Sequence, residues 1–419
     1  MMPVLPEGRL ELKELPPLEG PPWARVLRVV GYREAARLLA ALGVPERELD
    51  HLRDHVLYRL VQVGPVHNIV ARRLRRHFAH IGGEAAIPEG AYSDQGECDI
   101  ILMGRLDQFE QLCRRLDLLG PDLKSVGTVI RAALERDTGL RGNFLAKDKK
   151  IPAGTSTKIM GILNVTPDSF SDGGLFLDRN AAVQHGIRMW KEGADVIDVG
   201  GASSRPGAEP ISAQEQKRRI LPVIEELAAS VDAVISVDTS SAEVAEAALQ
   251  AGAHIINDIS ALRDDPEMID VAVESGAGVI LMHMRGTPKT MQELTDYKDL
   301  QSEVWKFLAE RSVWAMSKGV RRESIAIDPG IGFAKTPEQN LTILRRLGEF
   351  RSLGLPVVVG PSRKSFIGKI LDLPVEERLE GTAAASAWAV FQGAWMVRVH
   401  DVKPIARVCR IIDAILTSP

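Results

Sequence analysis

The chain has 419 residues, of which 45% are hydrophobic and 26% are charged, with 36 Gly and 24 Pro. This composition is typical of a folded globular protein and excludes collagen-like, disordered and coiled-coil chains. Because 52 Lys and Arg residues face 56 Asp and Glu residues, the net charge is -4, so the chain has no overall attraction for nucleic acid or anionic lipid and any anion site must be local.

No apolar run approaches the roughly 18 residues of a membrane-spanning helix, and the first residues are rich in Pro and Glu where a signal peptide would be basic and then apolar. The three cysteines, Cys98, Cys113 and Cys409, lie far apart and form no C-x-x-C pair, which disfavours a disulfide framework or a thiolate zinc site. We expect a cytoplasmic protein that binds neither membrane nor nucleic acid.

The first third of the chain predicts a small domain followed by a linker. Residues 1–22 contain several prolines and no periodicity, which predicts a loose arm. Residues 23–141 alternate short β-like runs with helical stretches, in which Val70 and Leu74 fall on one helical face, and so predict a small α/β (α+β) domain. Residues 142–156 combine a charge cluster with Pro-Ala-Gly and predict a linker.

This first domain offers little chemistry of its own. The arginine run at residues 72–76 lies opposite the apolar face of its helix and predicts a solvated surface. The pairs His51/His55 and His77/His80 have the spacing of metal ligands on a helix, but no carboxylate or cysteine partner completes either pair, so surface histidines are expected. We expect the domain to serve assembly or regulation.

From Lys158 onward the chain repeats an apolar run of about six residues, a polar loop and an amphipathic helix. The eight runs are KIMGILNV, DVIDVG, AVISVD, HIINDIS, GVILMHM, SIAIDPG, PVVVGPS and WMVRVH. Continuous Val/Ile/Leu runs are typical of parallel strands buried on both faces, and the helices supply the crossovers. Residues 157–419 therefore predict a (β/α)8 TIM barrel, whose active site is built at the carboxyl ends of the strands.

Polar residues gather at those predicted strand ends. Asp238 and Asp328 end the third and sixth runs, and with Asn257 they offer acceptors for a ring with adjacent N–H groups, such as a pterin or guanine. A divalent metal or general acid–base chemistry would use the same carboxylates, and the spacing leaves these alternatives open.

Cations follow the last two runs. Arg363 and Lys364 come after the seventh run, and Arg398 and His400 belong to the eighth. The loops after strands 7 and 8 of a TIM barrel often bind phosphate, so an anionic substrate is predicted. Because adjacent residues usually point apart, we expect only one of the first two to face inward, and favour Lys364.

Two loops after the first and second runs, NVTPDSFSDGG at residues 164–174 and GGASSRPGAEPIS at residues 200–212, are long and rich in Gly and Ser. Loops of this kind are often mobile lids. Phe170, Asp172 and Arg205 lie within them and strengthen that interpretation over a plain surface loop.

In this order, NVTPDSFSDGG, GGASSRPGA, SVDT, IND, LMHM, DPGIGF, SRKSFIG and RVHDV resemble the dihydropteroate synthase family, and the likeness covers residues 158–417. The resemblance implies condensation of 6-hydroxymethyl-7,8-dihydropterin diphosphate with p-aminobenzoate, giving 7,8-dihydropteroate and diphosphate in folate biosynthesis. Mg2+ is the implied cofactor, and a homodimer is expected. The run GGEAAIPEGAYSDQGECDIILMG resembles an extra domain that precedes the synthase in some bacteria.

The resemblance also implies a role for each motif residue. The pterin would be held by Asp238, Asn257, Ile259, Asp328, Phe333 and Lys364, and the diphosphate by Asn164, Arg205, Arg398 and His400, with Mg2+ on Asn164. Around p-aminobenzoate would lie Phe170, Ser204, Arg205, Pro206 and Ser365. Asp172, Arg205 and Lys364 would take part in catalysis, and no residue is assigned as a general base.

The sequence departs from the family pattern at two positions. Ala202 replaces the usual Glu of the second loop, and Ala334 replaces the usual Gly before Lys335, with no chemical consequence expected of the latter.

A pterin-dependent methyltransferase acting on a corrinoid protein would need no diphosphate site. A non-catalytic pterin-binding scaffold would have lost one of the groups above. Both are disfavoured, because every group implied for the diphosphate site is present.

Overall fold

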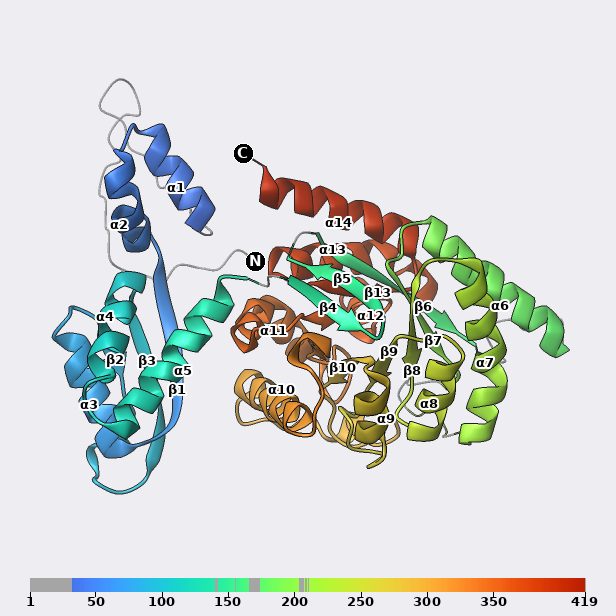
Figure 1. Ribbon diagram of the computed structural model, residues 1–419, viewed down its shortest axis with the longest axis horizontal. Helices are drawn as coiled ribbons and strands as arrows, with labels where there is room; N and C mark the ends of the chain where they lie inside the picture. The colour runs from blue at the N-terminus through green and yellow to red at the C-terminus, as the bar shows by residue number, and fades with distance from the viewer. Residues whose placement is uncertain are drawn as a thin grey trace. The chain divides into compact units, whose positions relative to one another are not determined.

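The computed structural model describes residues 32–139, 142–154, 156–165, 174–202, 207, 209 and 211–418 (Figure 1). The chain forms two compact units, Met1–Arg131 and Ala132–Pro419. The arm expected at residues 1–22 lies outside the described residues. None of the helices in the described ranges combines the length and apolar character needed to cross a membrane.

The first unit contains a three-stranded antiparallel sheet in the order β1-β3-β2. Its elements are α1 (Tyr32–Ala41), α2 (Glu46–Val56), β1 (Tyr58–His67), α3 (Asn68–Ala79), β2 (Glu84–Ala86), β3 (Glu97–Arg105), α4 (Leu106–Leu116) and the first part of α5 (Pro121–Asp137). Leu74 and Phe78, which lie on one face of α3, and Phe109 of α4 are fully buried. The small α/β domain predicted from the sequence is confirmed.

The arginine run of α3 is bonded to protein rather than only to solvent. Arg72 Nη1 donates to the carbonyls of Ala91 and Ser93 at 2.7 and 2.8 Å, and Arg73 Nη2 donates to Leu119 O at 3.3 Å. Arg75 and Arg76 are exposed, in keeping with a solvated face, whereas the half-buried Arg72 and Arg73 also fix neighbouring loops. His55 Nε2 lies 3.5 Å from Asp107, but no group of three possible metal ligands is found among the described His, Cys, Asp and Glu residues.

The predicted linker at residues 142–156 is instead largely a β-hairpin of β4 (Gly142–Ala146) and β5 (Lys149–Ala153). Phe144 and Ile151 are cross-strand partners, and both are buried in a cluster with Val196, Val234 and Met396 at the starts of barrel strands. The hairpin therefore closes the amino-terminal end of the barrel as part of its core.

Eight parallel strands form the barrel predicted from the eight apolar runs (Figure 1). They are β6 (Lys158–Asn164), β7 (Val196–Gly200), β8 (Val234–Asp238), β9 (Ile255–Asp258), β10 (Gly278–Met282), β11 (Ile325–Asp328), β12 (Val358–Val359) and β13 (Met396–Val399). The order β11-β10-β9-β8-β7-β6-β13-β12 closes through a parallel bridge between Ile327 and Val357. The (β/α)8 barrel is confirmed.

Helices surround the strands of this unit. They are α6 (Gly174–Lys191), α7 (Ala213–Ser230), α8 (Ala242–Gln250), α9 (Met268–Ser275), α10 (Leu300–Ser317), α11 (Pro337–Arg345), α12 (Ser365–Leu371), α13 (Leu379–Phe391) and α14 (Val402–Thr417). Short 3-10 helices span Glu89–Tyr92 in the first unit and Met291–Glu293, Arg322–Ser324, Leu347–Leu353 and Val375–Glu377 in the second.

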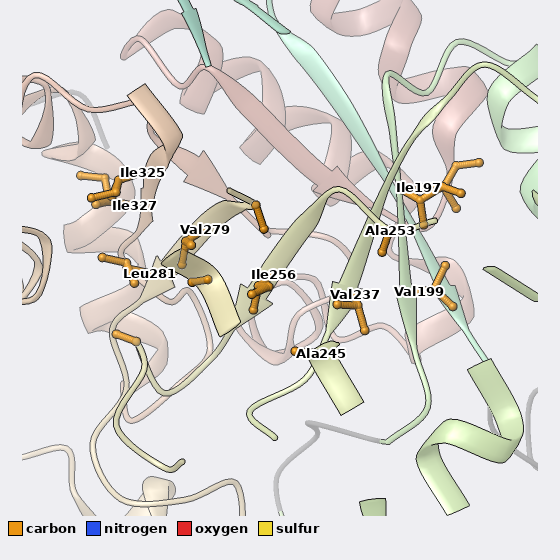
Figure 2. Packing of buried hydrophobic residues seen from close by; sticks show 14 of the residues in the cluster. Ile197, Val199, Val237, Ala245, Ala253, Ile256, Val279, Leu281, Ile325 and Ile327 are labelled. Atoms are coloured by element: carbon orange, nitrogen blue, oxygen red, sulfur yellow. The ribbon is translucent and has the colours of Figure 1, made fainter. Parts of the chain in front are cut away.

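Alternate residues of each strand face the helices or the barrel interior. Figure 2 shows Ile197 and Val199 of β7, with Val279 and Leu281 of β10, in the apolar layer shared with the helices. The intervening positions point inward. Along β7 these are apolar Val196 and then Asp198, so the interior changes from apolar at the hairpin end to polar toward the carboxyl ends.

Candidate active site

A buried ionic network joins β7, β8, β9 and β13. Arg398 donates from Nε to Asp198 Oδ2 and from Nη2 to Asp238 Oδ2, each at 2.6 Å. Asn257 Nδ2 donates to the same Asp198 oxygen at 3.0 Å. One guanidinium thus faces two carboxylates. The network joins three residues predicted for the site, Asp238, Asn257 and Arg398, with Asp198, which was not predicted.

Burial and neighbouring charges set the protonation of this network. The side chain of Asp198 is fully buried and that of Arg398 is 17% exposed. Burial raises the pKa of Asp238 to about 6, although Arg398 opposes the shift. Burial alone would lower the pKa of Arg398, but the carboxylates of Asp198 and Asp238 outweigh it and raise that pKa above its usual value. The guanidinium therefore stays charged, and the Asp238 carboxyl takes up a proton at a higher pH than an exposed aspartate does.

Sequence reasoning missed Asp198 as a site residue. The available signal was an acid inside an otherwise apolar run, which in a buried strand needs a partner. Asp198 Oδ1 and the Oγ of Ser236, its register partner on β8, are buried and have no hydrogen-bond partner among the described residues. Because leaving such atoms unpaired is costly, they are suited to an ordered water or a polar ligand atom.

Asp328 and Lys364 belong to the same electrostatic unit. Asp328 Oδ1 accepts a hydrogen bond from the Gly330 N–H at 2.7 Å, and burial raises the pKa of this carboxyl. Burial and Arg398 lower the pKa of Lys364 to about 8, while Asp328 and Asp238 act in the opposite direction. The site thus holds carboxylates and cations whose charges depend on one another.

Apolar side chains line the site beside these charges. Phe333 is 6% exposed and packs with Met282 and Met291, against which the half-buried Ile259 also packs. Lys364 Nζ lies 4.3 Å from the centroid of the Phe333 ring, within the range of a cation–π interaction. Apolar contacts beside several convergent polar groups suit a flat heteroaromatic ligand with polar edges.

The cations expected at the last two strands differ in what they can do. Arg363 makes a two-pronged ion pair with Asp401, at 3.0 and 2.7 Å, and is thereby held by that carboxylate. His400 Nδ1 lies 2.9 Å from Ser362 Oγ. Burial, with Arg398 and Arg363, lowers the pKa of His400 to about 3, so it is a neutral imidazole. The sequence analysis grouped His400 with the cations, whereas burial beside two guanidinium groups favours its neutral form.

The remaining predicted residues belong to the long loops and their borders. Asn164 ends β6 opposite Gly200, and no described residue gives its side-chain amide a hydrogen bond. Ser365 is the exposed first residue of α12. Five further residues lie outside the described ranges, namely Phe170, Asp172, Ser204, Arg205 and Pro206.

Comparison with known proteins identifies relatives of the barrel. Residues 160–400 match the family model described as pterin binding enzyme. A dihydropteroate synthase of Synechocystis is 52% identical over 263 residues, covering 62% of this chain and 91% of that protein. The crystal structure of a Yersinia pestis dihydropteroate synthase in a sulfonamide drug complex matches with 40% identity and a TM-score of 0.63, covering 66% of this chain and all of the other.

A further relative extends beyond the barrel. A probable bifunctional folylpolyglutamate synthase/dihydropteroate synthase of Halobacterium salinarum is 40% identical over 368 residues, covering 88% of this chain and 44% of that protein. A match of this length cannot be confined to residues 132–419, so it includes part of the first unit. Sequence related to the first unit is therefore also found within a longer chain.

Proposed function

The chain belongs to the dihydropteroate synthase family of pterin binding enzymes and is an enzyme of folate biosynthesis, and we propose how its own residues condense 6-hydroxymethyl-7,8-dihydropterin diphosphate with p-aminobenzoate. The proposal rests mainly on a cluster of four charged groups whose charges shift one another's pKa, next to the apolar side chains around Phe333. The four groups are Asp238, Asp328, Lys364 and Arg398.

The pterin ring would lie against Phe333 and Ile259 with its polar edges on the charged groups. Asp328 has one carboxylate oxygen engaged by Gly330 and the other left for the 2-amino and N3–H donors of the ring. Asn257 has its amide nitrogen on Asp198, which leaves its carbonyl oxygen as an acceptor. Lys364 would donate to a ring acceptor, and Asp238 would accept from a ring N–H.

The diphosphate would be bound by Asn164, Arg205, Arg398 and His400. Ser362 Oγ accepts from the His400 backbone N–H at 3.2 Å, so its own hydrogen is free to go to Nδ1. The neutral His400 imidazole then carries its hydrogen on Nε2 and can donate it to a phosphate oxygen. His400 would therefore act as a neutral donor and Arg398 as the positive charge.

The implied Mg2+ fits the donor set. Mg2+ takes oxygen ligands and is commonly bound by one or two protein groups together with substrate phosphates. Asn164 offers an amide oxygen that no described residue engages, and the described ranges hold no three-carboxylate cage that would compete with this arrangement. When bound, Mg2+ would neutralise charge that develops on the diphosphate as it departs.

The reaction would break the pterin C–O bond and form a C–N bond to the amine. As diphosphate leaves, positive charge spreads from the methylene carbon into the ring, where the carboxylates of Asp238 and Asp198 stabilise it. The weakly basic aromatic amine can then attack without a strong base. Phe170, Ser204, Arg205 and Pro206, which lie outside the described residues, would bind p-aminobenzoate, and Ser365 would bind its carboxylate. Asp172 would order the loops.

The test is release of diphosphate that requires both the pterin substrate and p-aminobenzoate. Asp328→Asn and Lys364→Ala should each lower kcat/KM for the pterin substrate by roughly 10- to 1,000-fold, because each removes a charged group that would hydrogen-bond the pterin ring in a buried site. Lys369→Ala, at an exposed position of the same helix as Ser365, is the matched control and should match the wild type. Near-normal kcat/KM in either site variant would exclude that residue from the pterin pocket.

We also propose that the barrel unit forms a homodimer through the outer faces of α11, α12 and α13. These helices line an apolar hollow of about 380 Å³. Within it Ile370 is 57% exposed and Trp388 is 45% exposed. Exposed apolar surface of this kind commonly marks a protein interface, and identical copies supply matching faces. The cytoplasmic location expected from the sequence stays a prediction.

A further inference from the structure

A fully enclosed lysine lies behind the proposed pterin pocket. Lys335 follows β11 by a few residues and is 2% exposed. Its Nζ donates to Gly330 O at 3.1 Å and to Phe333 O at 3.0 Å, and it lies 3.1 Å from His283 Nδ1. An ammonium group has three N–H donors and no acceptor, so these three partners use its whole bonding capacity.

His283 supplies the third acceptor only because it is neutral. Burial, and next Lys335, lower the pKa of this imidazole to about 2. Its lone pair therefore faces Lys335 at Nδ1, and its hydrogen sits on Nε2. The His283 backbone N–H also donates to Asp328 O at 2.9 Å. One residue at the end of β10 thus contacts Lys335 through its ring and Asp328 through its backbone.

The segment that Lys335 bonds has a strained backbone. Gly330, Gly332 and Ala334 have φ values of 71°, 85° and 49°, and only glycine adopts the left-handed region without a penalty. A Cβ on Gly330 would lie 2.1 Å from His283 O, so no other residue fits there. A segment of this kind keeps one conformation only when its surroundings impose it. The Ala334 departure from the family therefore has a conformational cost that the sequence did not reveal.

Other side chains hold two further carbonyls of the segment. Tyr297 Oη donates to Ala334 O at 2.9 Å, and Gln292 Nε2 donates to Gly332 O at 3.2 Å. Lys335 is distinct because it bonds both ends of the turn, at Gly330 and at Phe333.

Those two ends carry pocket groups. Gly330 donates its N–H to Asp328 Oδ1, and the Phe333 ring lies beside Lys364 Nζ. Burial lowers the pKa of Lys335 to about 7, while the Asp328 carboxylate favours its charged form. Removing an ammonium group from water costs free energy, and an apolar side chain that filled the same space would stabilise the fold at least as well. Its position between two pocket residues points to a role in binding.

We propose that Lys335, with neutral His283 as its acceptor, is a positioning residue that fixes Asp328 and Phe333 in the arrangement that binds the pterin ring, without itself touching the substrate. The proposal rests on the proposed function. It predicts that pterin affinity depends on the hydrogen-bonding capacity of Lys335, whereas the handling of p-aminobenzoate does not.

The experiment uses the full chain with Lys335→Met, which keeps a long side chain but removes all three donors. We expect the KM for the pterin substrate to rise about tenfold or more, consistent with the loss of buried hydrogen bonds, with kcat and the KM for p-aminobenzoate within about threefold of the wild type. Amide hydrogen exchange at residues 330–335 should become faster. Lys318→Met, at an exposed position, is the matched control.

Substitutions at His283 keep the test decisive if Lys335→Met does not fold. His283→Asn retains an oxygen acceptor close to the position of Nδ1 and should leave the pterin KM near normal, whereas His283→Leu should raise it. An unchanged pterin KM in Lys335→Met, or equal pterin KM values in the two His283 variants, would overturn the proposal. If the wild type releases no diphosphate, the proposed function fails instead. In that case, direct titration of the same variants with 7,8-dihydropteroate measures the effect of Lys335 on pterin binding without relying on turnover.

Discussion

At the scale of single residues, burial decides which of the ionisable groups at the strand ends carries a charge. Arg398 stays charged because two carboxylates face it, whereas His400, two residues further along the chain, is neutral. Sequence alone placed both in a group of cations. The difference arises from packing, since a guanidinium keeps its proton when buried and an imidazole loses it.

The neutral state of His400 predicts a pH effect on stability. Its pKa is about 3 in the folded chain and near 6.5 when unfolded, so between these values only the unfolded state binds the proton and stability falls as pH falls. His400→Gln removes this dependence. From pH 7.5 to 5, the wild type should lose up to about 2 kcal/mol relative to the variant in urea unfolding. A wild-type-to-variant difference equal at both pH values would show that His400 is not held neutral.

At the scale of elements, the eight apolar runs predicted the strands correctly because parallel strands buried on both faces are continuous in hydrophobicity. Asp198 was not predicted as a site residue, because it lies within one of these apolar runs and its partner Arg398 is 200 residues away in the sequence. The hairpin β4–β5 was missed for a different reason. Its charged turn, Lys147 to Lys150, suggested a linker, while the buried residues on either side are few. The roles of Asp198 and of the hairpin depend on contacts between residues distant in sequence, which a local sequence pattern does not show.

Phe144 tests the importance of this hairpin. It is 1% exposed, and its ring centroid lies 5.1 Å from that of Trp395. Phe144→Ala should reduce the free energy of unfolding of the barrel unit by about 3–5 kcal/mol, measured by urea unfolding. Activity at low temperature should persist, because the hairpin is at the opposite end of the strands from the charged groups. Lys150→Ala, at an exposed position of the same hairpin, is the control, and an equal effect of both changes would contradict a core role.

At the scale of the whole molecule, two units with separate cores share one chain, and the residues of the proposed site that the structure describes all belong to the second. The first unit has its own sheet and buried helices, and sequence related to part of it is found in a longer bifunctional relative. The outer helices α11, α12 and α13 leave apolar side chains exposed. The proposed homodimer would form through this face of the barrel unit.

Ile370 provides the test of that assembly. Ile370→Lys places a charge where the proposed interface would exclude water, and should shift the wild-type dimer to a monomer in light scattering or sedimentation. Val313→Lys alters a position on α10 that is 62% exposed, outside the apolar hollow, and should leave the dimer intact. A wild type that is already monomeric at micromolar concentration would contradict the proposed interface.

The closing hairpin also determines the order in which the barrel can be completed during synthesis. Phe144 and Ile151 leave the ribosome before any barrel strand. Trp395, whose Nε1 donates to Pro152 O at 3.1 Å, is made 243 residues after Pro152. Until Trp395 has been made, the apolar face of the hairpin lacks some of the contacts that bury it in the complete barrel. Contacts so distant in sequence slow folding, and the incomplete barrel presents that face to chaperones while translation continues. The two hairpin strands, which are made before the barrel strands, are thus among the last to be fully buried.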